Sequence, residues 1–129
     1  MSGEPTVNPL WERHDHGKVP RVRFLIEWVA GDEIVQTIRS DLHGLLDAAG
    51  GGGLLLDFER VQMFDSMFLT VIFGLVKRLG AEGGKLGLAC LNPKLTEIFQ
   101  SMPIESLPRL RLFESVAAAR DWFEEETAV

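Results

Sequence analysis

The pair Asp65-Ser66 has the clearest capacity for chemistry in this sequence, because it stands where a helix is expected to begin, directly before the apolar run 67–76. A serine hydroxyl at a helix N-terminus is well placed to carry a phosphate, since the unpaired N–H groups and the positive end of the dipole stabilise the added charge. Asp and Ser are also the usual residues that cap a helix. The pair therefore has two interpretations, a modification site and a plain cap.

Other groups with chemical potential are weaker candidates. His14-Asp15-His16 contains two possible metal ligands, but no third ligand lies at a sensible spacing, so a solvated loop is favoured. Cys90 ends an apolar run, and no histidine stands at a motif spacing from it or from a serine, which favours a small buried residue over a nucleophile. The glycines 50–53 precede a strand and lack the Lys-Ser or Lys-Thr of a phosphate loop. We therefore expect no metal, no cofactor and no enzyme activity.

Strand and helix patterns alternate along the chain. Within residues 21–28 every second residue is apolar, from Val22 to Trp28, which predicts a strand that buries this set. Alternation of this kind favours a sheet with helices packed on it. Further strands are expected at 54–57, 85–91 and 110–113, and helices at 33–49, 65–80, 93–101 and 115–126.

Length and charge narrow the class of protein. The 129 residues suit one domain, and 46% hydrophobic with 25% charged residues is a globular composition. The net charge of −6 disfavours nucleic acid and anionic membranes as partners. A single cysteine favours a reducing compartment, and the apolar run 67–76 is about half of what a membrane span needs. We expect a cytoplasmic protein with a flexible tail or edge strand in residues 1–18 and one domain in residues 19–129.

The apolar helix that follows Ser66 admits two interpretations. Residues 67–76 are apolar nearly all round, more than one buried face requires. The helix is either sandwiched between the sheet and its neighbours, or it leaves residues such as Phe68, Leu69 and Phe73 on a partner or dimer surface.

Taken together, four stretches resemble the STAS domain, the sulphate-transporter and anti-sigma-factor-antagonist family. The resemblance covers about residues 22–123. The matching stretches are the strand Leu55-Leu56-Asp57 with Val61 in its loop, Phe64-Asp65-Ser66, the turn Ala81-Glu82-Gly83-Gly84-Lys85-Leu86, and Leu110 to Phe123 with Phe113-Glu114-Ser115-Val116.

The resemblance implies both a fold and a function. The fold would be α/β, with a four- to five-stranded mixed sheet and about four helices packed mainly on one face. Ser66 would be phosphorylated by a partner that is both serine kinase and anti-sigma factor, and a phosphatase would reset it, so that partner switching regulates transcription. Together with Ser66, the implied partner-binding residues are Asp32, Asp65, Met67, Phe68 and Leu69.

Two departures from the family pattern keep an alternative open. Family members often have Ser and Gly after the phosphoserine, where this chain has Met67-Phe68, and the acidic residue expected after Gly31 is offset by one or two positions at Asp32. The alternative is a STAS scaffold that is not phosphorylated, or a dimerisation domain in a signalling complex, with a homodimer as a further possibility. A small enzyme is the third hypothesis.

Overall fold

The computed structural model describes residues 10–15, 19–49, 52–101 and 109–127. Its strands are β1 (Trp11–Arg13), β2 (Arg21–Phe24), β3 (Trp28–Val29), β4 (Gly53–Asp57), β5 (Met63–Phe64), β6 (Lys85–Ala89) and β7 (Leu110–Phe113). Its helices are α1 (Asp32–Ala49), α2 (Ser66–Ala81), α3 (Pro93–Gln100) and α4 (Val116–Thr127).

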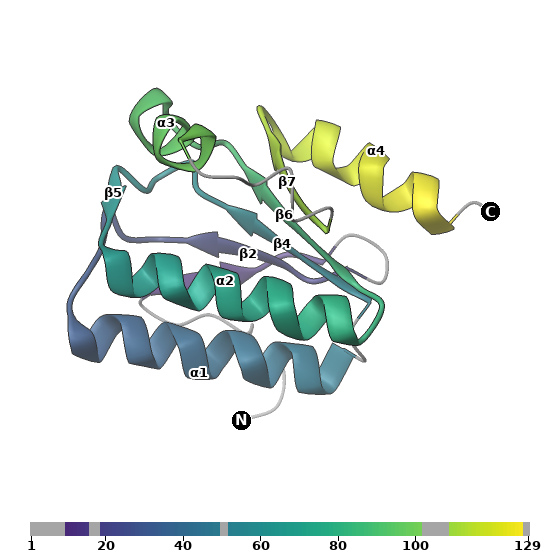
Figure 1. Ribbon diagram of the computed structural model, residues 1–129, viewed down its shortest axis with the longest axis horizontal. Coiled ribbons are helices and arrows are strands. Elements are labelled where there is room, and N and C mark those ends of the chain that lie inside the picture. The colour runs from purple at the N-terminus through teal and green to yellow at the C-terminus, as the bar shows by residue number, and fades with distance from the viewer. Residues whose placement is uncertain (1–9, 16–18, 50–51, 102–108, 128–129) are drawn as a thin grey trace.

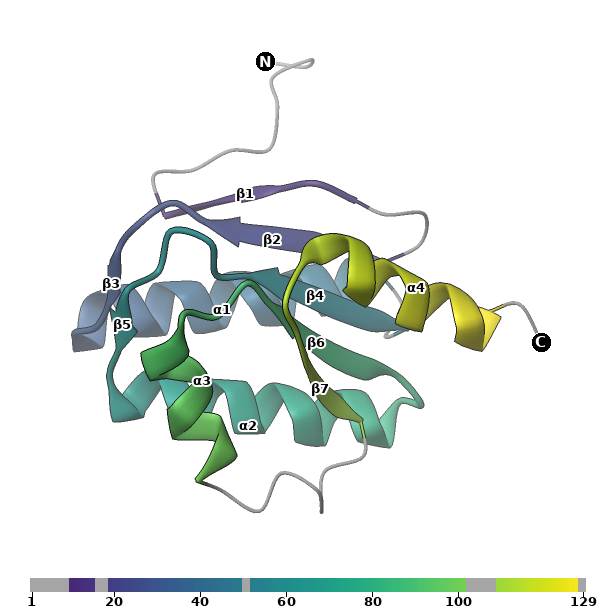
Figure 2. The same cartoon turned by 90° about the horizontal axis from the view of Figure 1, so that it is seen from above.

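Five strands form the main sheet in the order β1-β2-β4-β6-β7 (Figure 1). β1 is antiparallel to β2, and the remaining neighbours are parallel, so the predicted mixed sheet is confirmed. β3 and β5 form a separate two-stranded parallel ladder. Figure 2 shows this ladder at the end of the sheet where α1 and α2 begin.

Helices cover both faces of the sheet, which explains the unbroken apolar runs in its central strands. Every residue of β4 and β6 is buried. Side chains of α1, α2 and α3 pack into the larger core, whereas Ala119 and Phe123 of α4 pack in a smaller core with Leu55 and Ala89. Three of the four described helices therefore share one core, and α4 covers the other face (Figure 2).

A cluster of phenylalanine rings fixes the beginning of α2 against the sheet. The Phe68 ring lies 5.7 Å from that of Phe24 and 5.4 Å from that of Phe64, measured between centroids. Phe64 also contacts Phe99 of α3 at 5.8 Å. Such tilted and edge-on pairs stabilise by about 0.5–1.5 kcal/mol each beyond the area they bury.

The contact between α4 and the sheet depends on small residues beneath Phe123. A Cβ atom added at Gly53 would lie 2.8 Å from the Phe123 ring, and one added at Gly87 would lie 3.1 Å from it. Beside this contact the buried Lys85 donates from Nζ to the carbonyl oxygen of Trp122 at 3.0 Å and lies 4.2 Å from the centre of its ring. This arrangement satisfies a lysine that would be costly to bury alone.

The N-terminal part of the structure differs from the expected boundaries. The strand expected at 21–28 ends at Phe24, and the chain then leaves the main sheet to form β3. In the segment 1–18, for which a flexible tail or an edge strand was expected, β1 is an edge strand of the main sheet, and the buried Trp11 donates from Nε1 to Asp41 of α1 at 2.8 Å.

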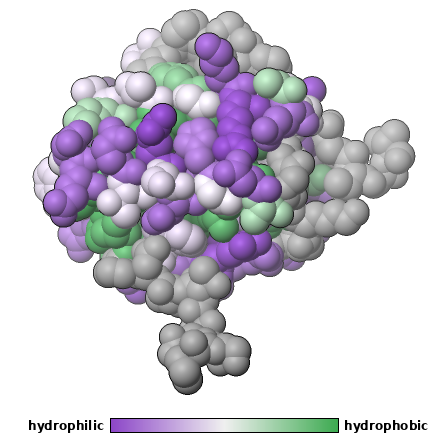
Figure 3. Space-filling view, turned by 90° about the horizontal axis from the view of Figure 1, so that it is seen from below, coloured by the Kyte–Doolittle hydropathy of each residue, from purple (hydrophilic) through white to green (hydrophobic). Residues whose placement is uncertain are grey.

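Arg78 of α2 links this helix to α1 through contacts with His43 and Asp47. Its guanidinium donates to Nδ1 of His43 at 2.9 Å and to the carbonyl oxygen of His43 at 3.2 Å, and it pairs with Asp47 and Glu82. Figure 3 shows the face over these helices as largely hydrophilic, with scattered apolar patches. The pKa of His43 is lowered by burial and by Arg78, so the folded protein holds this imidazole neutral.

This arrangement predicts a pH-dependent part of the stability. Because the pKa of His43 is lowered on folding, its contribution to stability is complete above the unfolded value near 6.5, and it is lost as the pH falls below that value and through the lower folded pKa. Between pH 7.5 and 5.5 we expect the free energy of unfolding in urea to fall by a few tenths of a kcal/mol more in the wild type than in His43→Gln. Identical pH profiles would contradict the role of His43.

Candidate functional site

Ser66 is exposed in the first turn of α2, and its neighbour Asp65 caps the helix. Asp65 has an extended backbone, with φ −94° and ψ 177°, and its Oδ1 accepts the N–H of Phe68 at 3.0 Å. The capping role expected of the pair thus belongs to Asp65. The Ser66 side chain lies at the helix N-terminus and faces solvent.

Asp65 also connects the beginning of α2 to the loop before α1. Its Oδ2 accepts the N–H of Gly31 at 3.0 Å, and its own N–H donates to the carbonyl oxygen of Val29 at 3.2 Å. The N–H of Gly31, and then that of Phe68, lower the pKa of the Asp65 carboxyl group. Gly31 has φ +95°, a conformation that favours glycine. The ionised carboxylate therefore holds Ser66 and the exposed Asp32 at the same end of the molecule.

The structure divides the predicted partner-binding residues into surface and core. Asp32 and Ser66 are exposed, and Asp65, Met67 and Leu69 are partly buried. Phe68 is fully buried in the phenylalanine cluster and has no side-chain surface to offer a partner.

The apolar helix α2 is mostly sandwiched, as the first of the two interpretations expected. Its exposed positions form a stripe of polar or small residues. The stripe runs through Ser66, Thr70, Gly74, Lys77 and Gly80, and the buried residues are Phe68, Val71, Ile72, Leu75, Val76 and Leu79. Of the residues suggested for an apolar surface, Leu69 and Phe73 are partly buried.

Trp28 is a surface residue. The alternation in residues 21–28 predicts that Trp28 lies on a buried strand face, and this prediction is wrong, since the side chain is 62% exposed. The chain leaves the main sheet after Phe24, so the alternation that buries Val22 and Phe24 does not continue to residue 28. In the β3–β5 ladder Trp28 stands opposite Met63.

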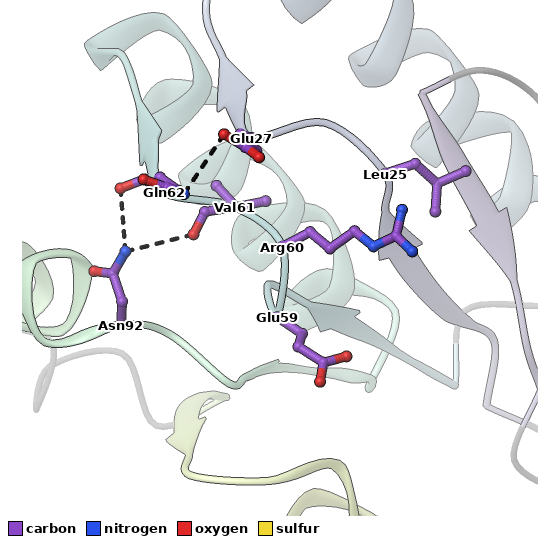
Figure 4. A pocket seen from close by; sticks show the side chains of 7 residues that line it. All are labelled: Leu25, Glu27, Glu59, Arg60, Val61, Gln62 and Asn92. Carbon is purple, nitrogen blue, oxygen red and sulfur yellow. Dashed lines mark hydrogen bonds between the residues drawn. The ribbon is translucent and has the colours of Figure 1, made fainter.

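A cavity of about 540 Å³ lies at the carboxyl ends of β2, β4 and β6 (Figure 4). Its polar groups mainly hold the loop between β4 and β5. The N–H of Gln62 donates to the carbonyl oxygen of Glu27 at 2.7 Å, and Nδ2 of Asn92 donates to the carbonyl oxygen of Gln62 at 3.1 Å. Glu59 accepts from Arg23 at 2.6 Å. These bonds position the segment that leads to Asp65.

The remaining candidate residues have structural contacts. Oδ1 of Asp15 accepts from Arg13 at 2.7 Å, His14 contacts Glu12, and His16 lies outside the described residues. Within the described ranges no three His, Cys, Asp or Glu side chains come together as a metal site. Burial, followed by Asp57, raises the pKa of Cys90 to about 11, so this thiol is protonated at neutral pH. In the part of the chain that the structure covers, no helix is both long and apolar enough to cross a membrane.

Comparison with known families identifies the class of this domain. The STAS domain family matches residues 32–119, more than half of the chain, and the chain therefore belongs to this family. The predicted family is thus confirmed. No curated protein matches the chain.

Solved structures share the fold at low sequence identity. The anti-sigma factor antagonist SpoIIAA in its unphosphorylated form is 16% identical, with a TM-score of 0.66 over 92% of this chain and 99% of that one. The phosphorylated form of the Bacillus cell fate determinant SpoIIAA is 18% identical, with a TM-score of 0.67 over 86% and 96%. An anti-sigma-factor antagonist (STAS) domain protein from Planctomyces limnophilus is 19% identical, with a TM-score of 0.75 over 88% and 96%. The chain thus has the fold of anti-sigma factor antagonists.

The two bonds of Asp65 predict a measurable loss on its removal. Asp65→Ala removes the acceptors for Phe68 and Gly31, and we expect the free energy of unfolding in urea to fall by about 1–2 kcal/mol at pH 7. Asp65→Asn keeps one carbonyl acceptor and should lose less.

The lowered pKa of Asp65 adds a pH test. The contribution of the Asp65 carboxylate to stability is present above its unfolded pKa near 3.8 and is lost as the pH falls through its lower folded pKa. The difference between wild type and Asp65→Ala should therefore shrink in acid. A difference that stays constant down to pH 3 would exclude the ionised cap.

Proposed function

We propose that this chain is an anti-sigma factor antagonist that binds an anti-sigma factor and is released from it when Ser66 is phosphorylated. The observation that carries the proposal is the place of Ser66, an exposed hydroxyl beside a carboxylate cap at the start of α2. Family membership and the likeness to SpoIIAA, known in unphosphorylated and phosphorylated forms, support it.

The start of α2 can accommodate a phosphate without disturbing the fold. Asp65 supplies the cap, so the Ser66 hydroxyl is not needed for it. The positive end of the helix dipole favours negative charge at this end. A kinase would transfer the γ-phosphoryl group of ATP to Oγ of Ser66, and hydrolysis by a phosphatase would restore the hydroxyl.

The same phosphate would oppose a docked partner. It adds about 1.5–2 negative charges next to the ionised Asp65 and close to the partly exposed side chain of Met67. A partner surface fitted to the hydroxyl must then desolvate a phosphate, which costs several kcal/mol unless a cation meets it. Release of the partner is the expected result.

The bulky pair after Ser66 is a smaller departure from the family pattern than the sequence suggests. Phe68 points into the core, where it contacts Phe24, Phe58 and Phe64. Only Met67, which is partly buried, presents extra bulk near Ser66. Access of a kinase to the exposed hydroxyl is therefore compatible with this sequence.

In this proposal the protein acts in the cytoplasm as a transcription regulator. Unphosphorylated, it would occupy the anti-sigma factor and so free a sigma factor, and phosphorylated, it would dissociate. A STAS scaffold that binds its partner without phosphorylation is the alternative, and the Ser66 site decides between them.

Phosphate mapping provides the first test. Purified protein is incubated with ATP and each kinase-type anti-sigma factor of the same genome, and modified peptides are identified by mass spectrometry. We expect phosphate on Ser66 in the wild type and none in Ser66→Ala. The control is Thr70→Ala, which removes the next exposed hydroxyl on the same stripe of α2 and should leave phosphorylation unchanged. Binding without any phosphate would favour the scaffold.

Calorimetric titration provides the second test. Ser66→Asp should weaken binding to the anti-sigma factor by about 30-fold or more, because an ionised group then occupies the contact. Ser66→Asn, which is similar in size but neutral, should weaken it much less. Equal affinity of the Asp variant and the wild type would contradict the charge mechanism.

A further inference from the structure

Trp28 is the large apolar side chain that the described part of the chain leaves exposed, at 62%. It lies opposite Met63 in the β3–β5 ladder. The following pair, Val29 and Phe64, is buried, so Trp28 and Met63 lie on the opposite side of the ladder, where Met63 is partly buried against the larger core. Tryptophan is the residue type most enriched where protein partners gain binding energy.

Backbone bonds hold Trp28 in place relative to Ser66. The carbonyl oxygen of Glu27 accepts from Gln62 at 2.7 Å and from Met63 at 3.2 Å, on one side of Trp28. On its other side the carbonyl oxygen of Val29 accepts from Asp65, which precedes Ser66. A partner would therefore meet a tryptophan whose backbone is already ordered, which reduces the entropy lost on binding.

The surroundings of Trp28 carry mainly negative charge. The segments 27–36 and 61–76 contain four carboxylates and neither lysine nor arginine, and the neighbouring Arg60 lines the adjoining pocket together with Glu27. Three of the carboxylates, those of Glu27, Asp32 and Glu33, belong to exposed residues. A second copy docked symmetrically would bring these like charges together, so a basic partner fits better.

We propose that Trp28 anchors a docking surface, formed with Met63 and Met67 and bordered by Glu27, Asp32 and Glu33, for a protein with an apolar socket edged by lysine or arginine. The inference rests on the proposed function, because it assigns this socket to the anti-sigma factor that Ser66 phosphorylation would release.

The anchor and the acidic border have separable kinetic roles. Burial of the indole in the socket slows dissociation, whereas the exposed carboxylates speed association with a basic partner and lose effect as salt screens them. Ser66 and Met67 adjoin in sequence at the start of α2, so a phosphate on Ser66 would meet the apolar part of the contact.

The test measures association and dissociation rates by surface plasmon resonance, with each purified kinase-type anti-sigma factor of the same genome immobilised. Trp28→Ala should raise the dissociation rate and lower affinity by about 30-fold or more, and Trp28→Phe should lose less. The double variant Asp32→Asn with Glu33→Gln should slow association at 50 mM salt, with a smaller effect at 300 mM. Its matched control, Glu114→Gln with Asp121→Asn, removes two exposed charges at and just before α4 and should bind like the wild type.

The outcomes separate this inference from the proposed function. Wild-type affinity in Trp28→Ala, with weakened binding in Ser66→Asp, overturns the anchor and leaves the switch. Weakened binding in Trp28→Ala alone supports the anchor and overturns the switch. Failure of every anti-sigma factor to bind the wild type overturns both. A wild-type dimer in sedimentation velocity that Trp28→Ala abolishes makes a second copy the occupant and overturns the basic partner.

Discussion

The carboxylate of Asp65 is the constraint on which this end of the molecule depends. One oxygen caps α2 and the other accepts the N–H of Gly31, so a single side chain connects the start of α2 to the residue that precedes α1. Lowering of its pKa by these N–H groups keeps it ionised. Ser66 can then remain exposed, because its neighbour has already satisfied the helix N-terminus.

The dense core beneath Ser66 makes the surface around this residue rigid. Phe68 follows Ser66 by two residues and packs against the rings of Phe24, Phe58 and Phe64, and Phe64 in turn contacts Phe99. Interiors packed at this density resist small displacements. The hydroxyl at Ser66 and the indole at Trp28 are thus presented on fixed backbone at the edge of a dense core, as recognition by a partner requires.

The sequence predicted the long elements and the helix cap, but not the short ladder that arranges the site. The helix at Ser66–Ala81 and the strand at Leu110–Phe113 agree with expectation to within a residue, because their apolar patterns are local and strong. β3 and β5 have two residues each, too few for a period-two pattern, and their pairing joins positions 35 apart. The exposure of Trp28 follows from that ladder and therefore could not be read from alternation.

The position of α4 determines where a module fused after this helix would lie. α4 packs through Phe123 on Gly53 and Gly87, and its C-terminal end points away from the β3–β5 ladder in both views (Figures 1 and 2). A module fused behind this helix, or a sensor surface to which it is coupled, would leave the opposite end of the molecule unobstructed. The fold thus places the C-terminal end of α4 and the exposed Ser66 at opposite ends of the molecule.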